Sequence, residues 1–307
     1  MAKSKAFIGV DVGTGSVRSA LVDKKGKILH TSIQAIKIHN PQPDFYEQSS
    51  IDIWTAVCQT VKEVIKVDGG KHEIEGIGFD ATCSLVIVGP EQEWDIIMWM
   101  DHRAKAETAF INGLGHRVLD YVGGQVSLEM QTPKLLWLKK NLPGVWNKAE
   151  AFFDLADFLT FKATGLDTRS LCTLVCKWTY RGQADAQGPE GWDRTYFDQI
   201  GLEDLAFDKI GQKVTYPGQK IGHLTERAAK DLGLKMNISV ATGLIDAHAG
   251  ALGLLATSNI KDISKTLSLI CGTSTCHMIL NKTKFQVPGI WGPYYSGKVS
   301  LSLGYQM

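Results

Sequence analysis

Two short turns rich in glycine and hydroxyl residues are the first candidates for chemistry in this sequence. One is Gly13-Thr14-Gly15-Ser16 and the other is Gly272-Thr273-Ser274, and each follows an apolar run typical of a strand. Such turns can present backbone N–H groups and hydroxyls in a concave arrangement that suits phosphate oxygens. A single turn of this kind is more often structural, but two of them, far apart in the chain, favour two half-sites that close on one phosphate chain.

Asp11 ends the strand that precedes the first turn. Because Mg²⁺ favours a carboxylate together with water and phosphate oxygens, Asp11 could hold Mg²⁺ beside a bound phosphate. The sequence contains no Walker A pattern, and no Rossmann G-x-G-x-x-G follows its first strand. A phosphate site here would therefore be of another type.

Asp246 follows the apolar run 238–245, which we predict to be a strand, and opens a stretch of small residues typical of a helix start. A carboxylate at that position is most simply an N-cap. His248, two residues later, is more often a core histidine than a catalyst. The residue types alone therefore favour structural roles for both side chains.

Lys177 lies in an apolar, strand-like run that includes Leu174, Val175 and Trp178. Its ammonium group could reach solvent along its long stem, or it could donate hydrogen bonds to several hydroxyls of a ligand. The residues alone leave both alternatives open.

Thr82-Cys83-Ser84 follow a strand that ends at Asp80, where α/β sheets commonly place ligand loops. They are equally ordinary turn residues. Asp101 and Arg103 are predicted to form an internal ion pair. Lys134 and Trp137 are predicted to share one face of a helix, with the tryptophan in the core and the lysine in solvent.

Alternating strands and helices must position these candidates. We predict strands over 6–11, 17–23, 28–38, 76–80 and 266–271, an amphipathic helix over 49–66 with a serine cap, helices over 104–111, 133–141 and 155–164, and a loop over 181–194. Strands and helices in this order favour an α/β layered fold.

The composition restricts the class of protein. The 307 residues include 33 Lys and Arg against 32 Asp and Glu, so the net charge of +1 gives no field that would attract nucleic acid or a membrane surface. No apolar stretch approaches the roughly eighteen residues of a membrane span, and the apolar run before Asp11 is too short for a signal peptide. The six cysteines are scattered, so we expect reduced core residues and a cytoplasmic location.

The two turns also carry a resemblance to a known family. Residues 11–18 resemble the first phosphate loop, and residues 271–274 the second, of the FGGY carbohydrate kinases, which have the actin-like, ribonuclease-H-like ATPase fold. The sequence is most similar to ribulokinase-like members of that family, through segments 78–84, 99–103, 133–138, 176–180 and 244–250. The resemblance implies an N-terminal sugar-binding FGGY kinase domain over 1–257 and the truncated start of a C-terminal nucleotide-binding domain over 258–307.

The resemblance implies a reaction, its cofactors and a set of site residues. The reaction is the ATP-dependent phosphorylation of a ketopentose similar to D-ribulose at a terminal hydroxyl, with Mg²⁺ at Asp11 and with Asp246 as the general base. The implied nucleotide contacts are Asp11, Gly13, Thr14, Gly15, Ser16, Arg18, Gly272, Thr273 and Ser274. The implied sugar contacts are Thr82, Cys83, Ser84, Lys177 and Asp246.

Other functions remain open at this point. The family continues through a second ATPase-fold domain, whereas this sequence stops at Met307. We therefore also consider an inactive form that binds sugar or a partner chain without turnover, and we expect weak ATP binding. An actin-like polymerising or chaperone ATPase would share the turns but would not need residues 82–84 or Lys177. The run 299–305 alternates like a strand, and we expect it to form an incomplete sheet edge; a homo-oligomer is also left open.

Overall fold

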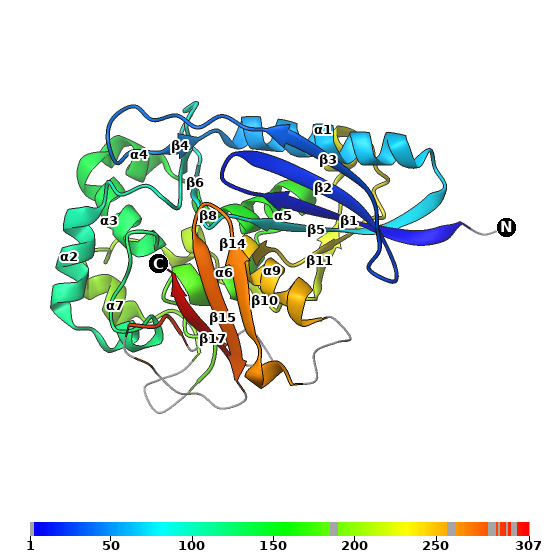
Figure 1. Cartoon of the computed structure of the whole chain (residues 1–307). Coiled ribbons are helices and arrows are strands. Elements are labelled where there is room, and N and C mark those ends of the chain that lie inside the picture. Colours follow the sequence, from blue (N-terminus) through cyan, green and yellow to red (C-terminus); the bar gives the residue numbers. More distant parts are fainter. Residues whose placement is uncertain are drawn as a thin grey trace.

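A seven-stranded sheet organises the computed structural model, which describes residues 3–184, 190–256, 262–281, 287, 289–292, 294–295 and 300–306 (Figure 1). Its strands lie in the order β11, β12, β5, β1, β2, β3, and β13 also pairs with β5. The first three strands in the chain form the predicted antiparallel meander. They are β1 (Ser4–Val12), β2 (Ser16–Asp23) and β3 (Ile28–Ala35). β5 (His72–Ala81) runs parallel to β1.

Three short strands extend this sheet beyond β5. They are β11 (Lys220–His223), β12 (Ser239–Ala241) and β13 (Leu244–Ile245). The prediction of one strand over 238–245 is therefore wrong, although β12 and β13 both run parallel to β5. The chain leaves the ladder at Thr242, whose amide donates to the carbonyl of Gln219 at 2.9 Å. At Gly243 a Cβ would lie 2.9 Å from the carbonyl oxygen of Ala156, so this close approach favours glycine.

Alternating side chains give β1 and β5 two different faces. The buried positions of these strands are Ala6, Ile8, Val10, Val12, Ile77, Phe79 and Ala81. All of them pack in one hydrophobic cluster with residues of the helix α1 (Ser50–Asp68). Because Asp11 and Asp80 occupy the alternate positions, they lie on the opposite face of the sheet.

The helix α1 confirms the predicted amphipathic helix and covers β2 and β3 (Figure 1). The Ser49 hydroxyl caps its start by accepting a hydrogen bond from the amide of Asp52 at 3.4 Å. Gly69 ends it in the left-handed conformation, with φ at 62°. Two further helices contribute to the same cluster, α5 (Leu155–Thr164) and α8 (Glu226–Leu232). This layering confirms the α/β class.

The middle of the chain forms a second layer around another hydrophobic cluster. Its helices are α2 (Lys105–Leu114), α3 (Gln131–Asn141), α4 (Pro143–Lys148), α6 (Leu171–Lys177) and α7 (Arg194–Gln199). A small sheet with the order β4 (Glu47–Gln48), β7 (Ile96–Ile97), β6 (Leu85–Val88) and β8 (Ala151–Asp154) packs beside them. Further short elements are η1 (Arg117–Tyr121), η2 (Phe207–Ile210), η3 (Ile263–Lys265), β9 (Arg169–Ser170) and β10 (Val214–Thr215).

The helix α9 (Asp246–Leu255) leads into a last sheet. That sheet has the order β14 (Leu267–Cys271), β15 (Thr275–Asn281), β17 (Ser300–Gln306) and β16 (Tyr294–Tyr295). A Cβ on Gly250 would lie 3.2 Å from the Ile270 side chain, so a small residue lets α9 approach β14. β17 is not an edge, because it pairs with β15 on one side and β16 on the other. The expected incomplete edge at residues 299–305 is therefore wrong.

Two lysines and one cysteine differ from their predicted environments. Lys177 ends the helix α6 instead of lying in a strand, and it is buried. Lys134 is fully buried instead of solvated, because its ammonium group donates to the carbonyl of Met98 at 2.7 Å. Cys271 is exposed, whereas four of the other cysteines are buried as expected. The predicted ion pair of Asp101 and Arg103 is confirmed, at 2.8 Å.

Burial lowers the pKa of Lys134 to about 8 and so predicts a pH-dependent stability. Between about pH 8 and pH 10.5 the lysine is protonated in the unfolded chain but neutral in the folded protein. The free energy of unfolding of the wild type therefore increases with pH in that range. Methionine does not titrate, so the stability of Lys134→Met lacks this gain. We therefore expect its free energy of unfolding, relative to wild type, to fall by up to about 3 kcal/mol across that window. Urea denaturation at pH 7.5 and 9.5 measures it, and a difference independent of pH would contradict the assignment.

Three sequence predictions fall partly on residues 185–189, 257–261 and 296–299, which lie outside the described residues. They are the centre of the loop 181–194, the domain boundary after residue 257 and the start of the last strand. Among the helices that the structure describes, none combines the length and the apolar character that crossing a bilayer requires.

Candidate active site

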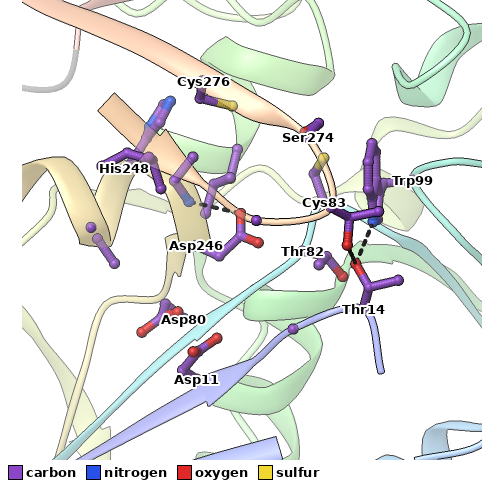
Figure 2. A pocket seen from close by; sticks show the side chains of 18 of the residues that line it. Asp11, Thr14, Asp80, Thr82, Cys83, Trp99, Asp246, His248, Ser274 and Cys276 are labelled. Atoms are coloured by element: carbon purple, nitrogen blue, oxygen red, sulfur yellow. Dashed lines mark hydrogen bonds between the residues drawn. The ribbon is translucent and has the colours of Figure 1, made fainter. Parts of the chain in front are cut away.

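Three parallel strands end side by side and bring three aspartates to one edge of the large sheet. In the strand register Asp11 of β1 pairs with Asp80 of β5, and Asp80 pairs in turn with Leu244 of β13. Asp246 follows directly after β13, at the start of α9. Figure 2 shows the three carboxylates around one space, with Asp11 and Asp80 close together.

A cavity of about 550 Å³ opens above these aspartates. It is bounded by both glycine-hydroxyl turns, by the loop after β5, by the end of α6 and by the first turn of α9. Its lining includes most of the predicted site residues: Asp11, Gly13, Thr14, Arg18, Thr82, Cys83, Lys177, Asp246, Gly272, Thr273 and Ser274. Three predicted contacts are not among its lining residues: Gly15, Ser16 and Ser84.

The apices of the two turns lie close together in the lining of the cavity. The amide of Gly13 donates to the carbonyl of Ser16 at 3.0 Å, and the amide of Gly272 donates to the carbonyl of Ser274 at 2.8 Å. These two glycine amides therefore close their own turns instead of facing a ligand. At the apices the hydroxyls of Thr14 and Thr273 lie 3.4 Å apart, so both turns can reach one bound group.

Asp11 is paired with a cation from the neighbouring strand. The guanidinium of Arg18 lies 2.8 Å from its carboxylate, and both side chains are partly exposed to the cavity. No group of three His, Cys, Asp or Glu side chains among the described residues is arranged to hold a metal ion. A single strand-end carboxylate fits a magnesium ion whose other ligands are water and phosphate oxygens.

Trp99 connects the first turn to the loop after β5. Its indole N–H donates to the Thr14 hydroxyl at 3.1 Å, and its backbone N–H donates to the Ser84 hydroxyl at 3.2 Å. Ser84 also shares a hydrogen bond with Thr82 at 3.2 Å and is fully buried. Ser84 therefore positions its neighbours and does not line the cavity itself.

Lys177 presents a cation to the other end of the cavity. Its ammonium group lies 3.2 Å from the Glu129 carboxylate and 4.4 Å from the ring centroid of Trp291. Burial opposes the charge of Lys177, but the neighbouring Cys83 and the carboxylate of Glu129 favour it, and the pKa of Lys177 is raised overall. The structure thus holds a charged ammonium group in a site that excludes most water.

Asp246 is not the N-cap of α9, because Ile245 holds that position. The amide of Ala247 donates to its carboxylate at 2.7 Å. Burial, and to a smaller extent the charge of Asp11, raises the pKa of Asp246 above its usual value. The carboxylate therefore binds a proton more readily than a surface aspartate does.

Asp80 is the carboxylate that sequence reasoning missed, although it ends a strand as Asp11 does. Burial first, and then the charges of Asp11 and Asp246, raise its pKa to about 9. The folded protein therefore keeps this proton up to about pH 9, whereas the unfolded chain loses it near pH 4.

Asp80→Asn is expected to stabilise the protein increasingly as the pH rises from 4 to 9. Wild-type stability falls over that window because folding must return a proton to Asp80, and asparagine needs none. Urea denaturation of both proteins at pH 5 and 8 measures the difference. An equal difference at the two pH values would show that Asp80 is ionised in the folded state.

Other residues that line the cavity were not predicted as site residues. They include Trp99, Cys176, His248, Cys276 and Trp291. Trp99 lies in the segment 99–103, which carried the family resemblance, and that resemblance could have identified it as a site residue. The Lys177 partner Glu129 gave no sequence signal, because it reaches Lys177 from a distant part of the chain.

Comparisons with known proteins agree with this geometry. A family model described as the N-terminal domain of the FGGY family of carbohydrate kinases matches residues 6–253. An FGGY carbohydrate kinase domain-containing protein of Xenopus laevis is 50% identical over 95% of this chain and 56% of its own length. A D-ribulokinase of Saccharomyces cerevisiae is 40% identical over 95% of this chain and 46% of its own length. The chain thus spans about half the length of these relatives.

Solved structures confirm the fold. A ligand-bound xylulose kinase from Lactobacillus acidophilus superimposes with a TM-score of 0.83 at 20% identity, over 98% of this chain and 59% of that one. A glycerol kinase of Plasmodium falciparum, solved with ADP, gives 0.82 at 16% identity, over 100% of this chain and 62% of that one. These similarities confirm the expected α/β, actin-like ATPase fold.

Proposed function

We propose that this chain, which belongs to the FGGY family of carbohydrate kinases, contributes the sugar site and the catalytic base for a phosphorylation reaction. The reaction transfers a phosphoryl group from ATP to a ketopentose. The observation that carries this proposal is the single cavity in which both hydroxyl turns, Asp246 and Lys177 meet. D-ribulose is the proposed sugar, since the yeast relative is a D-ribulokinase.

The turns and the strand-end aspartates would receive the phosphates of ATP. Thr14, Thr273, Ser274 and Arg18 supply hydroxyls and a positive charge, and Gly13, Gly15, Ser16 and Gly272 shape the turns around them. Asp11 would hold Mg²⁺, which neutralises charge on the phosphate oxygens when it is bound. This leaves Asp246 free for proton transfer.

Asp246 is proposed as the general base of the reaction. A terminal hydroxyl of the sugar loses its proton to the Asp246 carboxylate as its oxygen bonds to the γ-phosphorus, and the bond from that phosphorus to the bridging oxygen of ADP breaks. Lys177 would donate to sugar oxygens, and Thr82 and Cys83, which Ser84 positions, would form another wall of the site. Catalysis then depends mainly on positioning and on neutralising charge.

The division into a sugar-binding domain over 1–257 and the start of a nucleotide-binding domain over 258–307 remains part of this proposal. So does a cytoplasmic location, which the free state of all six cysteines supports.

Sugar-dependent release of ADP tests the proposed function. Purified chain is incubated with ATP, Mg²⁺ and D-ribulose, and with D-xylulose, D-ribose and glycerol in parallel, while calorimetry measures ATP and sugar binding separately. We expect the largest rate and the tightest sugar binding with D-ribulose. Sugar binding without ADP release would favour the alternative of a chain that binds without turnover, and binding of no sugar would contradict the proposal.

A further inference from the structure

A buried thiol–imidazole pair lies beside the proposed base and has no role in the reaction described above. His248 is in the first turn of α9, two residues after Asp246, and it lines the cavity. Its Nδ1 lies 2.9 Å from the sulfur of Cys172, the second residue of α6. Both residues are buried, at 9% and 1% exposure, so the hydrogen bond between them is shielded from water.

The surroundings of this pair determine which atom carries each proton. Burial raises the pKa of the Cys172 thiol well above its usual value, and burial together with the nearby charge of Lys177 lowers the pKa of His248 to about 3. Both groups are therefore neutral near pH 7. Since an imidazole nitrogen accepts better than sulfur does, the S–H donates to Nδ1 of His248.

A neutral imidazole has a single N–H group. If Nδ1 accepts the hydrogen bond from the thiol, the ring hydrogen must be on Nε2. No hydrogen-bond partner of Nε2 occurs among the described residues, and the ring borders the same cavity as Lys177 and Asp246. A ligand that fills this end of the cavity would meet two donors, the Lys177 ammonium and the His248 Nε2–H, and one acceptor, the Asp246 carboxylate.

We propose that His248 is a sugar-contacting residue whose Nε2–H donates to an oxygen of the sugar, and that Cys172 is a positioning residue that fixes the tautomer of His248. This inference rests on the proposed function, since it assigns the sugar to this end of the cavity. It replaces the sequence-based interpretation of His248 as a core residue without a ligand.

Two substitutions of His248 test which of the two ring nitrogens contacts the sugar. The amide nitrogen of glutamine can occupy the position of Nε2, whereas that of asparagine reaches only the position of Nδ1. We expect His248→Gln to keep the Kd for D-ribulose within about threefold of wild type. We expect His248→Asn to raise it about tenfold or more, equivalent to about 1.4 kcal/mol, the contribution of one hydrogen bond. Calorimetry measures both values, and circular dichroism verifies folding.

The tautomer gives a readout that a merely structural role would not change. Long-range ¹H–¹⁵N spectra of the wild-type chain should show protonated Nε2 and unprotonated Nδ1 for His248, with the His248→Gln spectrum providing the assignment. Cys172→Ser keeps a donor to Nδ1 and should keep that signature, whereas Cys172→Val should give a mixture of tautomers and weaker D-ribulose binding.

The outcomes distinguish this inference from the proposed function. Protonated Nδ1 in the wild type, or equal D-ribulose affinity in His248→Asn and His248→Gln, would overturn the role of His248 while leaving the sugar site intact. If His248→Asn does not fold, the spectra and the His248→Gln affinity still decide. Failure of the wild-type chain to bind any pentulose would instead overturn the proposed function, and this inference with it.

Discussion

Asp246→Asn is expected to lower kcat for sugar-dependent ADP release by about 10²- to 10⁴-fold, the usual contribution of general acid–base catalysis. Asparagine keeps the size of the side chain and can still contact a sugar hydroxyl, but it cannot accept the proton. The Kd for D-ribulose should therefore rise much less than kcat falls, which separates a catalytic from a binding role. Coupled ADP-release kinetics and calorimetry on the same preparations give the two numbers.

The matched control is Asp204→Asn, at a carboxylate that is half exposed, is paired with Lys139 and does not line the cavity. It should leave kcat and the Kd for D-ribulose unchanged. An Asp246→Asn protein with wild-type kcat would remove Asp246 from the role of base.

Lys177→Met is expected to weaken D-ribulose binding by about 1.5–3 kcal/mol, or roughly 10- to 150-fold, because a charged donor is removed from a buried site. Methionine keeps the apolar stem that packs in α6, so the fold should survive. The carboxylate of Glu129 then loses its partner at 3.2 Å, which should also lower the free energy of unfolding. Calorimetry measures the affinity, and urea denaturation measures the stability.

Lys139→Met serves as the control for the loss of a lysine charge, since Lys139 is partly exposed and pairs with Asp204 outside the cavity. It should leave sugar affinity unchanged. A Lys177→Met protein that binds D-ribulose as tightly as wild type would limit Lys177 to its ion pair with Glu129.

The sequence by itself determined the elements and the strand-end positions of the site. Apolar alternation and capping signals are local, so β1, β2 and α1 could be predicted closely, including a serine cap at the start of α1. The same local logic placed Asp11 and Asp246 at the ends of strands. Parallel strands end at a common edge, so these two residues could be expected to meet.

The role of Asp80 could not be predicted from the local sequence pattern. It ends β5 just as Asp11 ends β1, but its value as a site residue depends on the register that sets it between β1 and β13. The register is a contact between segments far apart in sequence, and a strand pattern alone does not specify its neighbours.

Only the tertiary structure decided the environments of the buried polar side chains. The pattern around Lys134 suggested solvent, and the pattern around Lys177 left solvent and a ligand both open. Glu129, Trp291 and the carbonyl of Met98 approach from other segments and provide partners for these two lysines in the interior. The pairing of Cys172 with His248 is of the same kind. A local pattern reports the preference of a side chain for water, whereas its protonation and its hydrogen bonds depend on partners that folding brings within about 3 Å.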